Sequence, residues 1–241
     1  MPLTTLYLVR HGQTLWNVEG RMQGRLDSGL TQVGTEQAHA HGRLLKRLGG
    51  VDRMISSPAG RTRETARILN AYVEAPLVYD DALQERDIGE WSGMTVAEIE
   101  ERYPQAWRVR MKEPYRFRPP GGENLEDMAV RCEELLGDLL GFEGESIVVV
   151  THQVMSRVIA GRLLGLSETE VVSVLHPNEL LYRFEFDGCS KTASRKAAAP
   201  RVAAVSHYVD GEGPRSGLLH QSQSETIARL RRETGSGDGL R

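Results

Sequence analysis

The chain has 241 residues, of which 39% are hydrophobic and 26% charged, and its formal net charge is −3, as is typical of a soluble globular protein with one large domain or one domain and a tail. The weakly acidic balance argues against a nucleic-acid binder, which would carry a basic face. The longest aliphatic run, residues 147–150, is too short to cross a bilayer, and residues 1–5 lack the charged start of a secretory signal.

Short apolar segments alternate with amphipathic ones along the chain, which predicts strands separated by helices. In chain order we expect a strand at 6–9, a helix at 31–48, a strand at 51–56, a helix at 58–72, a strand at 77–80, a helix at 96–111 interrupted at Pro104, a helix at 124–140, a strand at 146–151, a helix at 153–164, and strands at 179–186 and 202–209. Such alternation predicts an α/β fold, a three-layer sandwich with a mostly parallel central sheet and helices on both faces.

Local patterns add detail to three of these elements. Ser57 and Pro58 are typical of the N-cap and first position of the helix that follows the second strand. Arg61 then falls in the first helical turn, where free N–H groups favour an anion. The strand at 179–186 alternates polar and apolar residues, and we interpret it as an edge strand.

The composition changes near the C-terminus. We expect one domain over residues 1–210, with a linker at 190–200, and a polar, glycine-rich, mobile tail over 211–241. Within this tail, Ser222 and Glu225 have the spacing of a capping box before a short helix that carries Ile227 and Leu230. The two cysteines, Cys132 and Cys189, make no disulfide framework.

Two of the predicted strands end at a histidine. Arg10-His11-Gly12 follows the first strand and His152 follows the strand at 146–151. The tip of a buried strand in an α/β sheet is where ligand-binding and catalytic groups lie. Arg10 offers a fork of donors for phosphate or carboxylate, and Gly12 lets the backbone turn close to a ligand. This pattern indicates an anion pocket.

Five motifs that occur in order resemble the signature of the histidine phosphatase superfamily, also called the phosphoglycerate mutase-like family. They are Arg10-His11-Gly12-Gln13-Thr14-x-x-Asn17, Ser56-Ser57-Pro58-x-x-Arg61-x-x-x-Thr65-Ala66, Leu83-x-Glu85 with Gly89-x-Trp91-x-Gly93, Gly121-Gly122-Glu123-Asn124, and His152-x-x-x-x-Arg157. The likeness covers residues 5–182. One such motif alone is weak evidence, whereas five in order are specific.

The resemblance implies a role for each matching residue. His11 would be the nucleophile, because a neutral imidazole can attack a phosphomonoester and form a phosphohistidine. Glu85 would protonate the leaving oxygen and later deprotonate water. Arg10, Arg61 and His152 would complete the catalytic set as a clamp for the charge on the transferring phosphoryl group. The residues expected to bind substrate are Arg10, Asn17, Gln23, Arg61, His152 and Gln153. No metal ion and no cofactor are expected, since the arginines supply the charge.

The likeness implies a phosphatase. We expect a metal-independent phosphomonoester hydrolase that acts on a small metabolite such as a sugar phosphate, because the stretch from Glu85 to Gly121 is compact and dedicated mutases carry a longer insert there. A phosphoglycerate mutase is the alternative, and a phosphate-binding or regulatory protein without turnover is an alternative of another class. Most of the family has glycine after the second histidine, whereas Gln153 here is similar to the bisphosphatase domain that hydrolyses fructose 2,6-bisphosphate.

Other polar and aromatic residues are open to two interpretations. The basic residues Arg108, Arg110, Lys112, Arg116 and Arg118 bind a second anionic group of the substrate or form a solvated face. Nearby, Trp107, Tyr115 and Phe117 line the pocket mouth or pack beneath the insert. His39 and His41 point in different directions on a helix and are poor joint metal ligands, and His176 is expected to cap a turn.

These observations also set expectations about location and partners. We expect a cytoplasmic protein whose partner is a small phosphomonoester, with no nucleic acid and no membrane among its ligands. The sequence leaves open whether it is a monomer or a homodimer.

Overall fold

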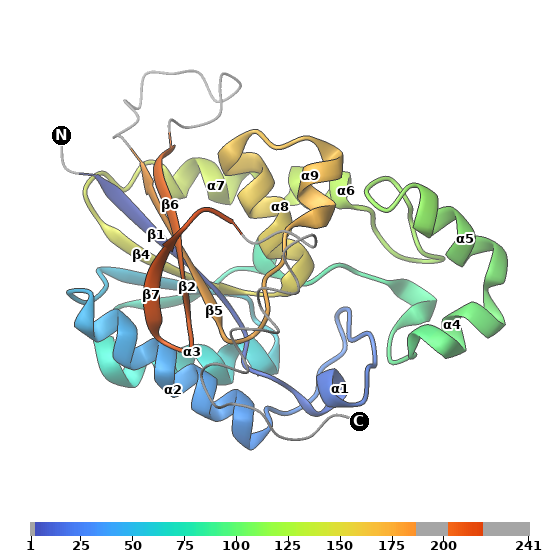
Figure 1. The fold of residues 1–241 in the computed structure, drawn as a ribbon, viewed down its shortest axis with the longest axis horizontal. Helices are drawn as coiled ribbons and strands as arrows, with labels where there is room; N and C mark the ends of the chain where they lie inside the picture. Colours follow the sequence, from blue (N-terminus) through green and yellow to red (C-terminus); the bar gives the residue numbers. More distant parts are fainter. Residues whose placement is uncertain (1–2, 187–201, 219–241) are drawn as a thin grey trace.

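The computed structural model describes residues 3–186 and 202–218. Within these residues, seven strands form one sheet in the order β3-β2-β4-β1-β5-β6-β7 (Figure 1). The strands are β1 (Thr4–Arg10), β2 (Arg53–Ser56), β3 (Leu77–Tyr79), β4 (Ser146–Thr151), β5 (Leu180–Phe186), β6 (Val202–Val209) and β7 (Glu212–Ser216). The half β3-β2-β4-β1 is parallel, and β5, β6 and β7 extend it in antiparallel fashion. The predicted α/β fold with a mostly parallel core is confirmed.

Helices cover both faces of the sheet, as the three-layer prediction requires. The described helices are α1 (Leu15–Val18), α2 (Gln32–Arg47), α3 (Gly60–Val73), α4 (Val96–Arg102), α5 (Pro104–Lys112), α6 (Leu125–Arg131), α7 (Glu133–Leu139), α8 (Gln153–Leu164) and α9 (Glu168–Ser173), with 3₁₀ turns η1 (Asp81–Leu83) and η2 (Gly89–Trp91). Helices α2 and α3 lie on one side of the sheet and α6 to α9 on the other (Figure 1).

The alternation of side chains along β1 divides the core between these two layers. Leu6 and Leu8 join the apolar cluster of α6, α7 and α8, whereas Tyr7 and Val9 join the cluster of α2 and α3. Successive residues of a strand point to opposite faces, so a continuous apolar run is what a strand buried on both faces needs. The first strand and its central place follow from this pattern.

Helices α4 and α5 lie to one side of the sheet and carry a small core of their own (Figure 1). Trp91 is fully buried there, and its ring stacks on Phe117 with 5.2 Å between ring centroids. As predicted, Pro104 interrupts the helical segment, since α4 ends at Arg102 and α5 begins at Pro104. Phe117 therefore packs beneath the insert, which was one of the two interpretations of the aromatic residues there.

Strand β5 is not an edge strand, so that prediction was wrong. It lies between β1 and β6 in the sheet. The polar alternation that suggested an edge has another cause, because Arg183 and Glu185 form an ion pair with each other at 2.8 Å. Strand β6, which follows the linker region, supplies the second partner.

Two predicted helices begin or end differently in the structure. Helix α3 begins at Gly60 after Ala59, so Ser57 is not its N-cap and Pro58 lies outside it. The segment predicted as one helix over 124–140 is two helices that meet at Cys132, with Asn124 as the N-cap of the first. The other predicted strands and helices are present. Elements β4, α8 and β6 have the predicted bounds, β1 is longer than predicted, and the rest differ by one or two residues at an end.

The sheet continues past residue 210, where we placed the end of the domain. Residues Glu212–Ser216 form β7, which pairs with β6 through Ser206 opposite Ser216 and His207 opposite Arg215. The predicted capping box at Ser222 and the predicted linker at 190–200 lie outside the described residues. Among the described helices, none is both long and apolar enough to cross a membrane.

Candidate functional site

Strands β1 and β4 bring the two strand-end histidines together. The strands are parallel neighbours with Arg10 opposite Thr151, so His11 and His152 follow at the same edge of the sheet. Their ring centroids lie 5.3 Å apart, and both side chains are buried. The amide of His11 donates to the carbonyl of Thr151 at 3.0 Å, which fixes the turn at the end of β1.

Hydrogen bonding leaves His11 with one free ring nitrogen. Its Nδ1 lies 2.8 Å from the carbonyl oxygen of Gly12, which can only accept, so Nδ1 carries the proton. Burial, together with the positive charges of Arg10 and Arg61, holds the pKa of His11 well below its usual range. The ring is therefore neutral at pH 7, with Nε2 unprotonated and able to act as a nucleophile.

His152 is oriented by a residue that we had placed in a capping role. Its Nε2 lies 2.8 Å from the hydroxyl of Ser57, and both side chains are fully buried. Burial and the charges of Arg61, His11 and Arg10 hold the pKa of His152 well below its usual range. Ser57 directly follows β2, the neighbour of β4, so this contact depends on the sheet order and not on a helix start.

Two buried arginines lie beside the histidines. Arg10 donates from Nη1 to the carbonyl of His176 at 3.1 Å, and burial lowers its pKa to about 10, so it stays charged at pH 7. Arg61 donates to the carbonyls of Leu26 at 2.7 Å and Gly24 at 2.9 Å and forms an ion pair with Asp27 at 2.9 Å. These contacts fix both guanidinium groups in place.

Several polar atoms at this site are buried without a hydrogen-bond partner among the described residues. They include the Nε atoms of Arg10 and Arg61 and Nδ1 of His152. An unpaired buried donor costs about 1–3 kcal/mol, so a cluster of them is unfavourable unless a ligand accepts from it. With two guanidinium charges at the same place, the arrangement suits an oxyanion.

Glu85 lies over the start of α8. Its carboxylate accepts from the amides of Val154 at 3.2 Å, Met155 at 3.3 Å and Arg86 at 2.8 Å. The first turn of a helix stabilises a negative charge, and these bonds hold the carboxylate in one orientation. Since α8 begins directly after His152, the same element positions the second histidine and the carboxylate.

A cavity of about 240 Å³ lies at this edge of the molecule. It is lined by Gly24, Arg25, Pro58, Ala59, Arg61, Gln84 and Glu85. Pockets for drug-sized ligands span roughly 300–1,000 Å³, so this cavity suits a small metabolite. Of the residues expected from sequence, Arg61 and Glu85 line it.

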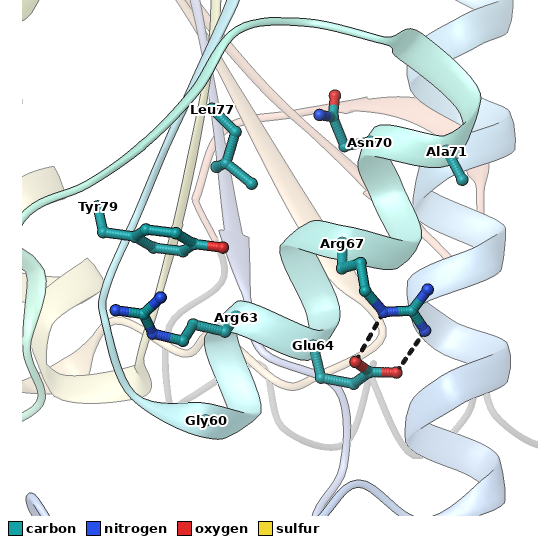
Figure 2. Close-up of a pocket in the computed structure, with 8 residues that line it drawn as sticks. All are labelled: Gly60, Arg63, Glu64, Arg67, Asn70, Ala71, Leu77 and Tyr79. Atoms are coloured by element: carbon teal, nitrogen blue, oxygen red, sulfur yellow. Dashed lines mark hydrogen bonds and ion pairs between the residues drawn. The ribbon is translucent and has the colours of Figure 1, made fainter.

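A larger hollow of about 440 Å³ lies elsewhere, on the outer side of α3 and β3. Figure 2 shows that Arg63 lies over the ring of Tyr79 and that Arg67 pairs with Glu64 there. None of the predicted site residues lines this hollow. It also lacks buried unpaired donors, so we place the functional site at the smaller cavity.

The predicted amide side chains lie in α1, in the loop that follows α1 and at the start of α8. Asn17 accepts from the amide of Thr14 at 3.1 Å through its carbonyl oxygen, so its NH₂ group is the part that remains for a ligand. Gln23 donates to the Thr14 hydroxyl at 2.8 Å. Gln153 is the first residue of α8 and is half-buried.

Two of the basic residues of the insert are paired at the surface. Arg116 forms an ion pair with Glu168 at 2.7 Å, and Arg118 forms one with Asp127 at 2.6 Å. Arg110 lies over the ring of Trp107, 4.4 Å from its centroid. Arg116 and Arg118 therefore fit the interpretation as a solvated face better than that of an anion subsite.

The loop before β5 contributes two residues whose contacts the sequence did not reveal. Asn178 donates from its side chain to the carbonyl of His11 at 2.7 Å, and the carbonyl of His176 holds Arg10. The His176 ring is fully buried and bonds the Leu180 carbonyl at 3.0 Å, and burial lowers its pKa to about 3. The sequence indicated only a turn cap at His176 and a strand that follows, and neither of these signals pointed to the contacts with Arg10 and His11.

Among the described residues, no group of three or more histidine, cysteine, aspartate or glutamate side chains is arranged to hold a metal ion. The positive charge at the site is carried by the guanidinium groups of Arg10 and Arg61.

Comparison with known proteins gives consistent results. Residues 6–198 match the model of the histidine phosphatase superfamily, branch 1. Phosphoserine phosphatase 1 of Hydrogenobacter thermophilus is 35% identical over 164 residues, which cover 68% of this chain and 77% of that protein. The probable phosphoglycerate mutase GpmB of an Enterobacter species is 34% identical over 165 residues, covering 67% of this chain and 75% of that one.

Solved structures agree with these matches. The native structure of the mycobacterial glucosyl-3-phosphoglycerate phosphatase Rv2419c superimposes with a TM-score of 0.72 and 27% identity, over 83% of this chain and 97% of that one. Some curated relatives are longer, and the chain spans 41% of the length of those that match it at 38% identity.

Proposed function

The chain belongs to the histidine phosphatase superfamily, and from this we propose that it hydrolyses small phosphomonoesters through a phosphohistidine on His11, without a metal ion. The observation that carries the proposal is the state of His11. Its Nδ1 donates to the Gly12 carbonyl, which leaves a neutral, unprotonated Nε2 beside buried donors suited to a phosphate. Among relatives, a phosphatase and a probable mutase both match the chain.

In the first proposed step, Nε2 of His11 attacks phosphorus and the bond from phosphorus to the ester oxygen breaks. Glu85 in its protonated form gives its proton to the departing oxygen, so that an alcohol leaves. Arg10, Arg61 and His152 stabilise the charge on the three remaining oxygens.

In the second step, water attacks the phosphohistidine from the side that the alcohol has left. Glu85, now a carboxylate, takes a proton from this water, and the bond from phosphorus to Nε2 breaks. Inorganic phosphate and neutral His11 result. The half-buried position of Glu85 beside the cavity supports its exchange of protons with a leaving group and with water.

The experiment that tests this function is phosphate release from a panel of phosphomonoesters in EDTA, with wild type and His11→Ala. We expect release that survives EDTA and is lost in the variant, together with an acid-labile, alkali-stable phosphoadduct in wild type. Release that requires an added metal ion, or that persists in His11→Ala, would contradict the proposed route.

A phosphoglycerate mutase is the second candidate, favoured by the match to GpmB. Against it, the segment between Glu85 and Gly121 holds only α4, α5 and η2, which is short for the insert that dedicated mutases carry. Conversion of 3-phosphoglycerate into 2-phosphoglycerate without phosphate release would establish the mutase. Reversible phosphate binding with no phosphoadduct and no turnover would establish a binding protein.

A further inference from the structure

Arg25 lines the same cavity as Glu85 and Arg61, although no sequence motif drew attention to it. Its neighbours along the chain are the two residues whose carbonyls hold the Arg61 guanidinium, Gly24 at 2.9 Å and Leu26 at 2.7 Å. Gly24 has a φ of +54°, a left-handed conformation that favours glycine. The backbone on both sides of Arg25 is thereby tied to Arg61, and both arginines line the same cavity.

The Arg25 guanidinium is available to a ligand. Its side chain is 42% exposed, and its nearest carboxylate oxygens lie 3.7 Å away on Asp87 and 3.6 Å away on Glu123, longer than hydrogen bonds. The same Glu123 oxygen already accepts from the Asp87 amide at 2.9 Å and from Arg131 at 2.8 Å. Loose exposed pairs of this kind contribute about 0–1 kcal/mol, so a ligand anion can displace them.

We infer that Arg25 binds a second anionic group of the substrate, so that the preferred substrates are phosphomonoesters that also carry a carboxylate or a second phosphate. This inference rests on the proposed function, because it assigns the reacting phosphate to Arg10, Arg61 and His11. A planar guanidinium matches either anion with two parallel hydrogen bonds, whereas a hydroxyl in the same place leaves its charge unpaired. Arg25 is then a specificity-determining residue and takes no part in the bond changes.

Matched substrates with and without the second anion provide the test. The pair 3-phosphoglycerate and glycerol 3-phosphate differs in a carboxylate, and the pair fructose 1,6-bisphosphate and fructose 6-phosphate differs in a second phosphate. In at least one pair, we expect wild type to have a higher kcat/KM on the member with the second anionic group. The pair that shows this preference identifies the anion that Arg25 binds. Arg25→Gln should lower kcat/KM on that member about 10- to 100-fold and leave the other member within twofold. The kcat/KM of Arg25→Lys on that member should lie between those of wild type and Arg25→Gln.

Arg67→Gln is the control, since this arginine lies on α3, the same helix as Arg61, but lines the other hollow and pairs with Glu64 there (Figure 2). It should leave both pairs unchanged. An equal fall on both members of a pair in Arg25→Gln, or no fall on either, would overturn the inference while leaving the phosphatase intact. If wild type hydrolysed neither these four esters nor any other ester of the panel, the proposed function would fail. The Kd of 3-phosphoglycerate and of glycerol 3-phosphate, measured by calorimetry for wild type and Arg25→Gln, would then still test the role of Arg25. Weaker binding of 3-phosphoglycerate alone in Arg25→Gln would support this role, and an equal change or no change for both ligands would contradict it.

Discussion

Burial and neighbouring guanidinium groups act in the same direction on the histidines at the ends of β1 and β4. Both effects lower the pKa of His11 and of His152, because a further positive charge near Arg10 and Arg61 is unfavourable in a buried place. A phosphate brings negative charge and acceptor oxygens to the same place. The residues are therefore arranged for an anion at some cost to the free protein.

Glu85 is one of several carboxylates on its loop, and a matched pair of variants can identify the acid. Glu85→Gln should lower kcat about 10²- to 10⁴-fold with little change in KM, because general acid–base catalysis contributes about that much. Glu90→Gln is the control. Glu90 accepts from the hydroxyl of Tyr103 at 2.9 Å on the exposed side of the loop, so its loss should leave kcat unchanged.

The measurement is steady-state phosphate release across a pH series. An unchanged kcat in Glu85→Gln would remove this residue from its assigned role. A loss in Glu90→Gln as large as that in Glu85→Gln would show that the loop, and not one carboxylate, was disturbed.

At this scale, the sequence revealed residues at strand ends but not their partners across the fold. His11 and His152 could be paired because parallel strands end at the same edge of a sheet. Ser57 and Asn178 could not be linked to them, since these contacts span 95 and 167 residues and depend on which strands are neighbours. Hydrogen bonds of a buried hydroxyl or amide leave no periodic pattern in the sequence.

Among the elements, the loop after β1 and the first turn of α2 lie so close to each other that each carries a glycine at the contact, Gly12 in the loop and Gly34 in the helix. A Cβ on Gly34 would lie 2.1 Å from the carbonyl oxygen of Gln13, and one on Gly12 would lie 2.2 Å from that of Gly34. Alanine inside a helix is ordinarily more favourable than glycine by about 1 kcal/mol. Here Gly34→Ala should instead destabilise the protein by about 1–3 kcal/mol, because backbone must move.

The same variant should also lower activity, since the displaced backbone carries His11. Gly29→Ala is the matched control, as a Cβ there meets nothing within 4 Å. Urea unfolding gives the free energy of unfolding, and phosphate release gives kcat/KM. Equal stability of Gly34→Ala and wild type would show that this contact is loose.

Predictions for elements failed where tertiary partners decided the outcome. The polar alternation of β5 suggested an edge, but Arg183 and Glu185 form an ion pair with each other, and β6 pairs with the outer edge of β5. Ser57 and Pro58 fit a helix start, but the hydroxyl was taken by His152 and the helix began three residues after Ser57. By contrast, the interruption at Pro104 was predictable because proline limits the backbone by itself.

At the scale of the whole molecule, the parallel half of the sheet was predictable and the antiparallel half was less so. Continuous apolar runs such as β1 and β4 occur only where both faces are covered, and alternating helices provide that cover. Strand β7 is five residues long and mostly exposed, so its sequence resembles a polar tail. Only its pairing with β6 makes it part of the sheet.

The buried histidines as a set make the stability of the protein depend on pH. For each of five, burial is the largest cause of a pKa below the usual value of about 6.5, and for His176 the pKa falls to about 3. They are His11, His41, His152, His176 and His207. The unfolded chain binds protons at these residues from about pH 6.5 downward, whereas the folded chain does not. The contribution of these neutral rings to the stability of the folded protein is therefore complete above pH 6.5 and is lost as the pH falls below it.

For His176, whose pKa in the folded protein is about 3, lowering the pH to one unit below 6.5 costs about 1.4 kcal/mol. With the other four histidines acting in the same direction, the free energy of unfolding should fall by at least ~2 kcal/mol between pH 7.5 and pH 5.5. Urea unfolding at the two pH values measures it. Carboxylates with a lowered pKa, such as Asp127 paired with Arg118, act only at lower pH. Repeating the series in 1 M salt separates the causes, because salt screens surface charges but not burial. A free energy of unfolding that is the same at both pH values would mean that the buried rings already carry protons in the folded protein.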